Sequence, residues 1–352
     1  MKNLHIFSHI FGISMCCILL FSCEREEVTA SGPFASFTAS VGSGSETKGT
    51  PVENLQDFRN RMEIFTIWGF MNGSPIQGEK SNFYNRNVRI FGDRYFPIDA
   101  AGEWDQLALP SGLTRQNEMF YGLAIGGLRD KVEVTQATID RITFNYESHR
   151  PVTDSKDVYY LRDAEALGEL MAGVLTSGGV NEDGIIPIVF SHPMASVKFR
   201  VGDVNKTFTI KDISFQGVLT SGTCSFTRDN ENNIVMSWSD VGTSTDYTQI
   251  YDYTVFANTP KDSDINDTKL SKSWFFIPQE FPETSTSKIV IRYELFGKDY
   301  TSEIPLEGTK YEINKQYCYT LSKNGVVLES SVASWSLGGN VQKQYSEPGI
   351  YW

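Results

Sequence analysis

The stretch Phe34-Ala35-Ser36-Phe37-Thr38-Ala39-Ser40-Val41 carries the clearest strand pattern in the chain. Its apolar side chains alternate with serine and threonine, so they fall on one face of an extended backbone. The pattern predicts a first strand with one buried face. Residues 42–50, Gly-Ser-Gly-Ser-Glu-Thr-Lys-Gly-Thr, follow directly and favour an exposed loop of the kind that proteases cut. The predicted inward-facing residues of the strand are Ala35, Phe37, Ala39 and Val41.

Similar short patterns recur along the chain and predict an all-β fold. Two of the predicted strands end in turn dipeptides, Asn72-Gly73 and Gly92-Asp93. An apolar stripe at helical spacing, residues 161–174, predicts a short helix in the first half. Because parallel strands need a helix between almost every pair, the pattern favours β-sandwiches over a parallel sheet. Further strands are predicted at residues 64–70, 88–91, 142–146, 197–201 and 289–295.

The length of 352 residues accommodates about two domains of ordinary size. A second set of strand patterns begins near Ile185, so we expect the domain boundary near residue 190. We therefore divide the folded part into an N-terminal β-sandwich, residues 34–190, and a C-terminal β-sandwich, residues 191–352.

Residues 1–22 are typical of an export signal peptide. Lys2 supplies a positive start, and a mostly apolar run extends from Ile6 to Phe21. The run ends in Leu20-Phe21-Ser22-Cys23, which resembles the bacterial lipobox, so we expect cleavage before Cys23 and acylation of its thiol. Two or three acyl chains anchor a protein stably. This predicts an outer-membrane lipoprotein in which residues 23–33 form the tether; an ordinary secretory signal is the alternative.

The charge balance excludes one class of partner. Acidic residues outnumber basic ones by 43 to 31, a formal net charge of -12, which offers no footprint for nucleic acid. Residues 24–27, Glu-Arg-Glu-Glu, follow the lipid cysteine and resemble the surface-export signal of Bacteroidota lipoproteins. A solvated linker is the alternative interpretation of that run.

Motifs for enzyme chemistry are absent from the sequence. It contains no phosphate-binding loop, nucleophile elbow, H-E-x-x-H or C-x-x-C pattern. His149 lies in a polar turn and His192 precedes a proline, so we interpret both as surface or structural residues. The stretch Asp262 to Asn266 has the oxygen-ligand spacing of a calcium loop but lacks its glycine and bidentate glutamate. We expect no catalytic residue, no cofactor and no metal.

Cysteines and tryptophans leave alternatives open. Cys224 and Cys318 either form one disulfide in an oxidising compartment or stay buried as free thiols. The six tryptophans would stack on sugar rings if they were exposed. Most of them lie within strand patterns, however, so we expect four or five of them in the core.

Several segments together resemble the fimbrillin, or Mfa-like, family of Bacteroidota surface lipoproteins. Their order and spacing behind the lipobox carry the resemblance, which spans nearly the whole mature chain. The segments are Thr47-Lys48-Gly49-Thr50-Pro51, residues 188–199 (IVFSHPMASVKF), residues 210–217 (IKDISFQG), residues 311–321 (YEINKQYCYTL) and Val332-Ala333-Ser334-Trp335.

The resemblance implies two tandem transthyretin-like β-sandwich domains that serve as subunits of type V pili. In that family a protease removes the lipidated N-terminal segment with the first strand, and a terminal strand from a neighbouring subunit fills the groove. Loss of residues 35–41 would here expose apolar side chains and unpaired backbone groups, which favours such a replacement. The candidate donor lies within residues 326–337 and includes Val332, Ala333, Trp335 and Leu337.

The loop after the first strand departs from the family pattern, in which an arginine-specific protease acts. Lys48 is the candidate cleavage residue, because residues 42–50 contain no arginine; absence of cleavage is the alternative. An uncleaved protein would remain anchored as a base subunit or a stand-alone surface protein.

We expect a non-enzymatic fimbrial subunit or fimbria-associated lipoprotein with roles in cell adhesion and biofilm. Its partners would be other pilus subunits or copies of itself and, through Cys23, the membrane. The alternative function is a surface glycan-binding lipoprotein of a polysaccharide-uptake system, which would need two or three exposed tryptophans or tyrosines on one face.

Overall fold

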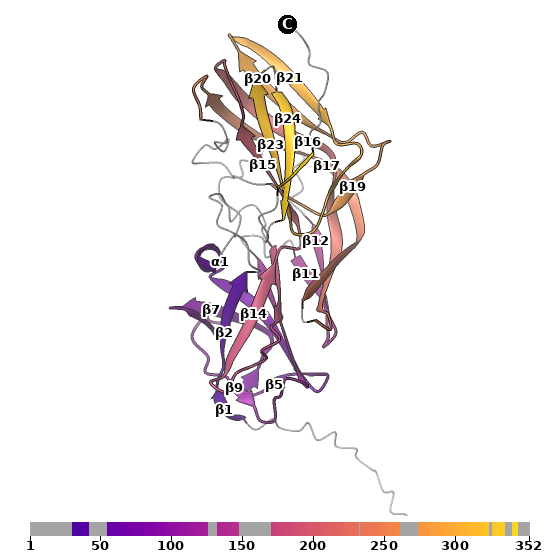
Figure 1. Ribbon diagram of the computed structural model, residues 1–352. Helices are drawn as coiled ribbons and strands as arrows, with labels where there is room; N and C mark the ends of the chain where they lie inside the picture. The colour runs from indigo at the N-terminus through magenta and orange to yellow at the C-terminus, as the bar shows by residue number, and fades with distance from the viewer. Residues whose placement is uncertain are drawn as a thin grey trace, which may run out of the picture.

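The chain forms two lobes stacked end to end in an elongated molecule (Figure 1). This computed structural model describes residues 30–41, 55–125, 132–147, 170–231, 233–260, 274–323, 326–334 and 340–343. Regular structure in these ranges is β-strand with one exception, the short helix α1 (Leu55–Arg61). The predicted all-β class is therefore confirmed.

The first lobe is built mostly from residues before Pro193 and the second mostly from residues after it. The strands of the first lobe are β1 (Ala30–Phe34), β2 (Ser36–Val41), β3 (Ile64–Met71), β4 (Ser74–Pro75), β5 (Gln77–Gly78), β6 (Ser81–Asn82), β7 (Tyr84–Phe91), β8 (Arg94–Pro97), β9 (Ala108–Pro110), β10 (Glu118–Ile125), β13 (Leu170–Leu175) and β14 (Ile185–Ser191).

The remaining strands form the sheets of the second lobe and the connection between the lobes. They are β11 (Val132–Ala137), β12 (Ile142–Glu147), β15 (Ala195–Val201), β16 (Phe208–Arg228), β17 (Ile234–Val255), β18 (Trp274–Phe276), β19 (Gln279–Phe281), β20 (Lys288–Leu295), β21 (Lys298–Pro305), β22 (Thr309–Tyr311), β23 (Lys315–Lys323), β24 (Val326–Ser334) and β25 (Asn340–Lys343).

The strands predicted from alternation and turn dipeptides all form. Asn72 and Gly73 adopt positive φ angles of 51° and 81°, which a tight hairpin between β3 and β4 requires. Gly92, at φ 66°, lies in the turn from β7 to β8. These turns form where predicted because their backbone demands are local.

Seven strands of the first lobe close into a barrel. Their order is β10-β13-β14-β2-β8-β7-β3. The last strand, β3, also pairs with the first, β10, and this pairing closes the ring. Every pair in this ring is antiparallel except β2 with β14, which run parallel. The β-sandwich expected for residues 34–190 is thus not confirmed, because the pairing of β3 with β10 joins the two ends of the sheet. Closure leaves no free edge in the ring.

The helix predicted at residues 161–174 is wrong for its last five residues, which belong to β13; the others lie outside the described residues. All six residues of β13 are buried. A run that is apolar at every position satisfies a helical stripe by chance, whereas it is also typical of a strand covered on both faces.

A pair of glycines gives the barrel room for a large ring. Gly122 of β10 lies opposite Gly173 of β13, and Phe190 of β14 packs against both. A Cβ added at Gly173 would lie 2.6 Å from Ile188 Cγ2 and 2.8 Å from the Phe190 ring. Such distances are shorter than van der Waals contact, so any larger residue at this position would force Ile188 and Phe190 to shift.

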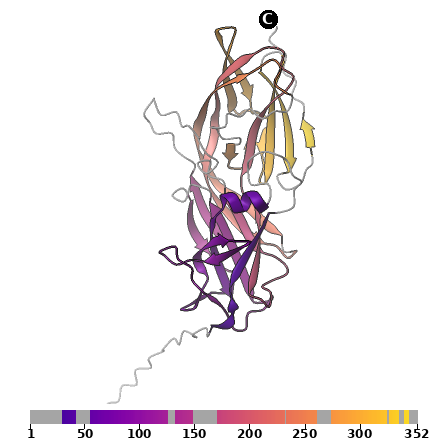
Figure 2. The same cartoon turned by 90° about the vertical axis from the view of Figure 1, so that its left-hand side faces the viewer.

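Helix α1 closes the end of the barrel that faces the second lobe (Figure 2). Its Phe58 is fully buried, with a ring centroid 4.6 Å from that of Phe190. Phe58 also meets Phe65 and Tyr95 edge-to-face. The helix thereby extends the aromatic core of the barrel to its rim.

The second lobe is a β-sandwich. One sheet has the order β18-β15-β23-β24-β25, and the other contains β20, β21 and the adjoining halves of β16 and β17. Between them lies a separate hydrophobic core that includes Phe199, Phe215 and Tyr319.

A long hairpin, β16 with β17, runs through both lobes. One half of β16 pairs with β20, and the other half pairs with β12, from Ser221–Glu147 to Phe226–Ile142. Accordingly Phe215 is buried in the second core while Cys224 and Phe226 are buried in the first. The predicted boundary near residue 190 stays a prediction, because this hairpin contributes to both cores.

Candidate functional site

The predicted first strand, β2, is part of the barrel wall. On one side it pairs in parallel with β14, from Ser36–Ile185 to Val41–Phe190. On the other side it meets β8 at the pair Phe37–Tyr95. Figure 1 shows β2, in indigo, alongside the pink β14. No hairpin turn links β2 to either neighbour, since both lie far along the sequence.

The side chains of β2 alternate largely as the sequence predicts. Ser40 is exposed on the outer face, but Ser36 is only 3% exposed because the strand enters the wall there and its N–H donates to Gly184 O at 3.0 Å. The inward-facing residues are buried or, for the last one, half-buried: Ala35, Phe37, Ala39 and Val41.

Phe37 is the largest side chain that β2 adds to the core. It is fully buried, and its ring centroid lies 6.4, 6.3 and 6.2 Å from those of Phe65, Phe83 and Phe120. The ring planes meet at 88°, 60° and 70°, the edge-to-face arrangement that aromatic quadrupoles favour. Sequence alternation identified Phe37 but carried no signal for these three partners.

The segment before β2 is also bound to the barrel. The N–H of Ala35 donates to Leu107 O at 2.8 Å. Strand β1 pairs antiparallel with β9, from Ala30–Pro110 to Phe34–Ala108. Residues 30–41 therefore form one continuous bound ribbon.

Strand β2 is the first strand of the ring in chain order. It precedes every other strand of the ring, so a cut after Val41 leaves the remaining chain covalently whole. Its departure would open the ring between β14 and β8 and uncover the aromatic neighbours of Phe37. Backbone groups of β14 would lose their partners, and such groups require new ones.

The candidate donor segment lies in the second lobe. Val332 and Ala333 belong to β24, which pairs with β23 on one side and β25 on the other. Val332, for example, lies between Tyr317 and Val341. Strand β24 is thus paired on both edges with strands of its own chain.

Several predicted positions fall outside the described residues: Cys23, Lys48, His149, the stretch 262–266, Trp335 and Leu337. Within the described ranges, no helix is long and apolar enough to cross a membrane. The same ranges contain no group of three histidine, cysteine or acidic side chains placed to hold a metal ion.

Comparison with protein families gives a direct match. A family model described as fimbrillin-like matches residues 135–335, more than half of the chain. The chain belongs to the fimbrillin-like family.

Solved structures of similar architecture include three proteins of related description. A proposed cell adhesion protein from Bacteroides ovatus is 12% identical, with a TM-score of 0.48 over 87% of this chain and 98% of that one. A fimbrial assembly protein from Parabacteroides distasonis is 11% identical, with a TM-score of 0.39 over 89% and 100%. The tip fimbrial protein Mfa3 from Porphyromonas gingivalis is 9% identical, with a TM-score of 0.39 over 86% and 100%. No curated protein sequence matches the chain.

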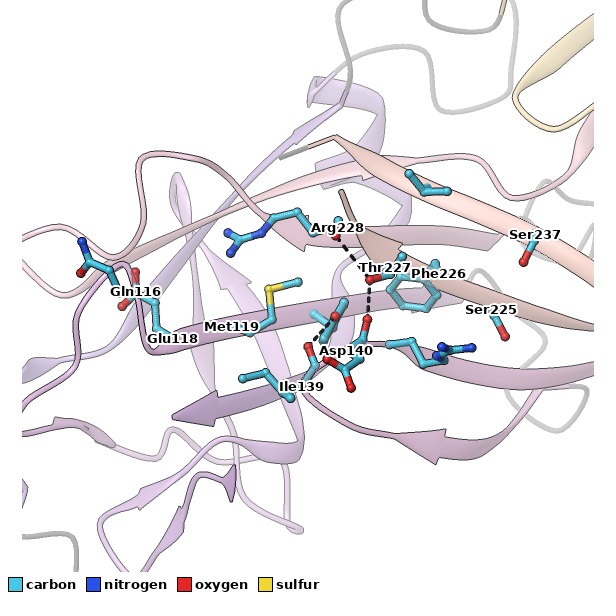
Figure 3. Close-up of a pocket in the computed structure, with 13 residues that line it drawn as sticks. Gln116, Glu118, Met119, Ile139, Asp140, Ser225, Phe226, Thr227, Arg228 and Ser237 are labelled. Atoms are coloured by element: carbon cyan, nitrogen blue, oxygen red, sulfur yellow. Dashed lines mark hydrogen bonds between the residues drawn. The ribbon is translucent and has the colours of Figure 1, made fainter. Parts of the chain in front are cut away.

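This fimbrillin-like protein has a cavity of about 480 Å³ where the barrel meets the tip of the long hairpin (Figure 3). Its polar groups are engaged with the surrounding backbone. Glu118 accepts a hydrogen bond from the N–H of Val180 at 2.8 Å, Thr227 Oγ1 donates to Asp140 O, and Arg228 donates to a carbonyl of β13. Burial raises the pKa of the Glu118 carboxyl. Of these contacts, the one from Arg228 joins the hairpin to the barrel.

The thiols of the fimbrillin-like protein are separate. Cys224 is buried in the first core, Cys318 is buried in the second lobe, and the two form no disulfide. Of the two alternatives, a disulfide or two buried thiols, the structure has the second. Burial raises the pKa of the Cys224 thiol, which disfavours the reactive thiolate.

Four of the six tryptophans lie in the described part of the chain, so the expectation of four or five core tryptophans stays a prediction. Trp68 and Trp274 are buried, and the half-buried Trp238 donates its Nε1–H to Pro193 O at 2.6 Å. Trp104 is the exception among the described tryptophans, with 47% of its surface exposed.

Proposed function

We propose that this protein is a non-enzymatic fimbrial subunit, or a fimbria-associated surface lipoprotein, that assembles by strand replacement. Acylation of Cys23 holds the newly exported chain at the outer membrane. Cleavage near Lys48 then lets β2 leave with the lipidated segment, and a strand from a neighbouring subunit enters between β14 and β8. Cell adhesion and biofilm formation are the roles that follow from such a fibre.

The position of β2 in the barrel is the observation that carries the proposal. The strand provides a fully buried phenylalanine and a complete parallel partner for β14, yet no turn ties it to the ring. A replacement strand would regain main-chain hydrogen bonds worth about 1 kcal/mol each. It would also rebury apolar surface at roughly 25 cal/mol per Å². Such a junction would dissociate slowly.

The donor in this proposal is the C-terminal segment that contains Val332, Ala333, Trp335 and Leu337. Because β24 pairs with β23 and β25 in the isolated chain, donation requires its release from that sheet. The segment would then serve its own lobe in the free subunit and the barrel of a neighbour in the fibre.

The alternative of a glycan-uptake lipoprotein has less support. It needs two or three tryptophans or tyrosines on one exposed face. Trp104 is the one clearly exposed tryptophan in the described part of the chain.

A cleavable variant of the chain from residue 24 to 352 tests the proposal. The recognition sequence of a site-specific protease replaces residues 44–50, and the cut protein is studied by size-exclusion chromatography with light scattering and by mass spectrometry. We expect the cut chain to release the fragment that contains β2 and to form oligomers, while the uncut chain stays monomeric.

Synthetic peptides identify the strands involved. Excess peptide of residues 30–41 should keep the cut chain monomeric, and a peptide of residues 326–337 should bind it in a 1:1 complex. A scrambled version of the second peptide is the control. A cut chain that loses the fragment yet remains folded and monomeric would overturn the proposal.

A further inference from the structure

One pair of exposed aromatic side chains on the first lobe is in mutual contact. Single exposed apolar residues are normal on protein surfaces, whereas clusters mark binding sites. Phe91 and Trp104 are 67% and 47% exposed, and their ring centroids lie 5.3 Å apart. The other large exposed apolar residues belong to four separate places in the described chain: Phe34, Val235, Phe256 and Phe296.

A third ring completes this aromatic cluster of Phe91, Phe96 and Trp104. Phe96, on the outer face of β8, lies 5.7 Å from Trp104, centroid to centroid. Both phenylalanines meet the indole steeply, at 71° and 84°. Two edge-to-face partners orient the indole, while nearly half of its surface stays in solvent.

The loop that carries Trp104 is held in one conformation. Trp104 forms a β-bridge with Ile98. Asp99 Oδ1 accepts the N–H of Glu103 at 2.9 Å, and the Asp99 N–H donates to Glu103 O at 2.9 Å. Arg89 Nη1 donates a hydrogen bond of 3.0 Å to the backbone O of Gly102, which lies between Asp99 and Glu103 in the loop. The cluster therefore stands on a closed loop and a hairpin, so little ordering would accompany binding.

Polar groups of both signs border the cluster. Asp93 and Glu103 are exposed, and Arg94 is half-buried, each within two residues of an aromatic member. Asp105, directly after Trp104, forms an ion pair with Arg86. The border thus offers hydrogen-bond donors and acceptors without a strong local excess of one charge.

We propose that Phe91, Phe96 and Trp104 form a binding subsite for a neutral carbohydrate. The apolar C–H face of a pyranose ring matches the exposed indole in size, and its hydroxyl groups match the mixed carboxylate and guanidinium border. Three partly exposed rings fall well short of the roughly 800 Å² per partner of a stable protein interface. The net charge of -12 disfavours polyanionic glycans.

The test uses the full chain from residue 24 to 352 and a panel of named sugars. Cellohexaose, mannohexaose and xylohexaose are the neutral members, and a polygalacturonate oligomer is the anionic member. Isothermal titration calorimetry and tryptophan fluorescence measure binding. We expect saturable binding of at least one neutral member, and Trp104→Ala should weaken it about tenfold or more, a loss of about 1.4 kcal/mol.

Two variants keep the test decisive. Phe296→Ala removes an aromatic that is 76% exposed at a turn of the other lobe, and it should leave binding unchanged. Trp104→Tyr retains a ring and should keep much of the affinity, and thermal melts verify that each variant folds. Absence of binding by every neutral member, binding of the anionic member alone, or binding unaffected by Trp104→Ala overturns the proposal. The outcome is independent of strand replacement.

Discussion

Phe37→Ala measures how strongly β2 holds the barrel together. The side chain is fully buried and touches three aromatic rings at centroid distances of 6.2 to 6.4 Å. A buried phenylalanine replaced by alanine typically lowers the free energy of unfolding by 3–5 kcal/mol. Each edge-to-face contact adds about 0.5–1.5 kcal/mol beyond the buried area. We therefore expect a loss of about 4 kcal/mol.

The assay is urea and thermal unfolding of the chain from residue 24 to 352, followed by circular dichroism and tryptophan fluorescence. For a unit of 150–250 residues, about 4 kcal/mol corresponds to a fall in Tm of roughly 8–16 °C. Thr38→Ala is the matched control, because Thr38 is the next residue of the strand and is half-buried on its other face. The control should change the free energy of unfolding by less than about 1 kcal/mol.

The Phe37→Ala substitution also tests whether β2 is an integral part of the barrel core or only a weakly bound segment. A Phe37→Ala loss below about 1 kcal/mol, or one equal to that of Thr38→Ala, would refute the inference that β2 fills the core. A peptide of residues 30–41 carrying Phe37→Ala should also compete poorly for the opened barrel.

Two further predictions concern Glu118 and Gly173, which belong to strands of the barrel wall. Because burial raises the pKa of Glu118 in the folded state, stability should fall as pH rises from about 4.3, the ordinary glutamate value, through the raised value. Glu118→Gln should remove this component, so its stability relative to the native chain should increase from pH 4 to 7; parallel urea-unfolding curves would contradict the argument. Gly173→Ala should lower the free energy of unfolding by about 1–3 kcal/mol because its Cβ would clash with Ile188 and Phe190. Gly178→Ala, whose Cβ would meet only Thr176 Oγ1 at 3.6 Å, should be near neutral, and equal melting temperatures for the two variants would count against the packing argument.

Local chemistry explains which features of this fold were predictable. The alternation in residues 35–41 and the dipeptide Asn72-Gly73 act over a few residues, so they specify a strand and a hairpin wherever the segment is placed. The inward set that begins with Ala35 and Phe37 followed from the same period. These signals require no knowledge of a partner strand.

Long-range pairing explains what could not be predicted. Nothing near Phe37 indicates that β2 runs parallel to β14, or that its ring enters a cage made by Phe65, Phe83 and Phe120. The pairing of β3 with β10 makes a barrel where a sandwich was expected, and it joins residues about fifty positions apart. Segment 170–174 has an apolar pattern compatible with helix and strand alike. It forms a strand because β10 and β14 pair with it on either side.

The amino-acid sequence by itself thus specifies the strand-rich character of this protein and the alternating strand at residues 35–41, because those properties depend on composition and nearest neighbours. The closed ring and the site between β14 and β8 arise only when distant strands pair. Pairing energies depend on which backbones and side chains meet in space, and that information is spread over the whole chain.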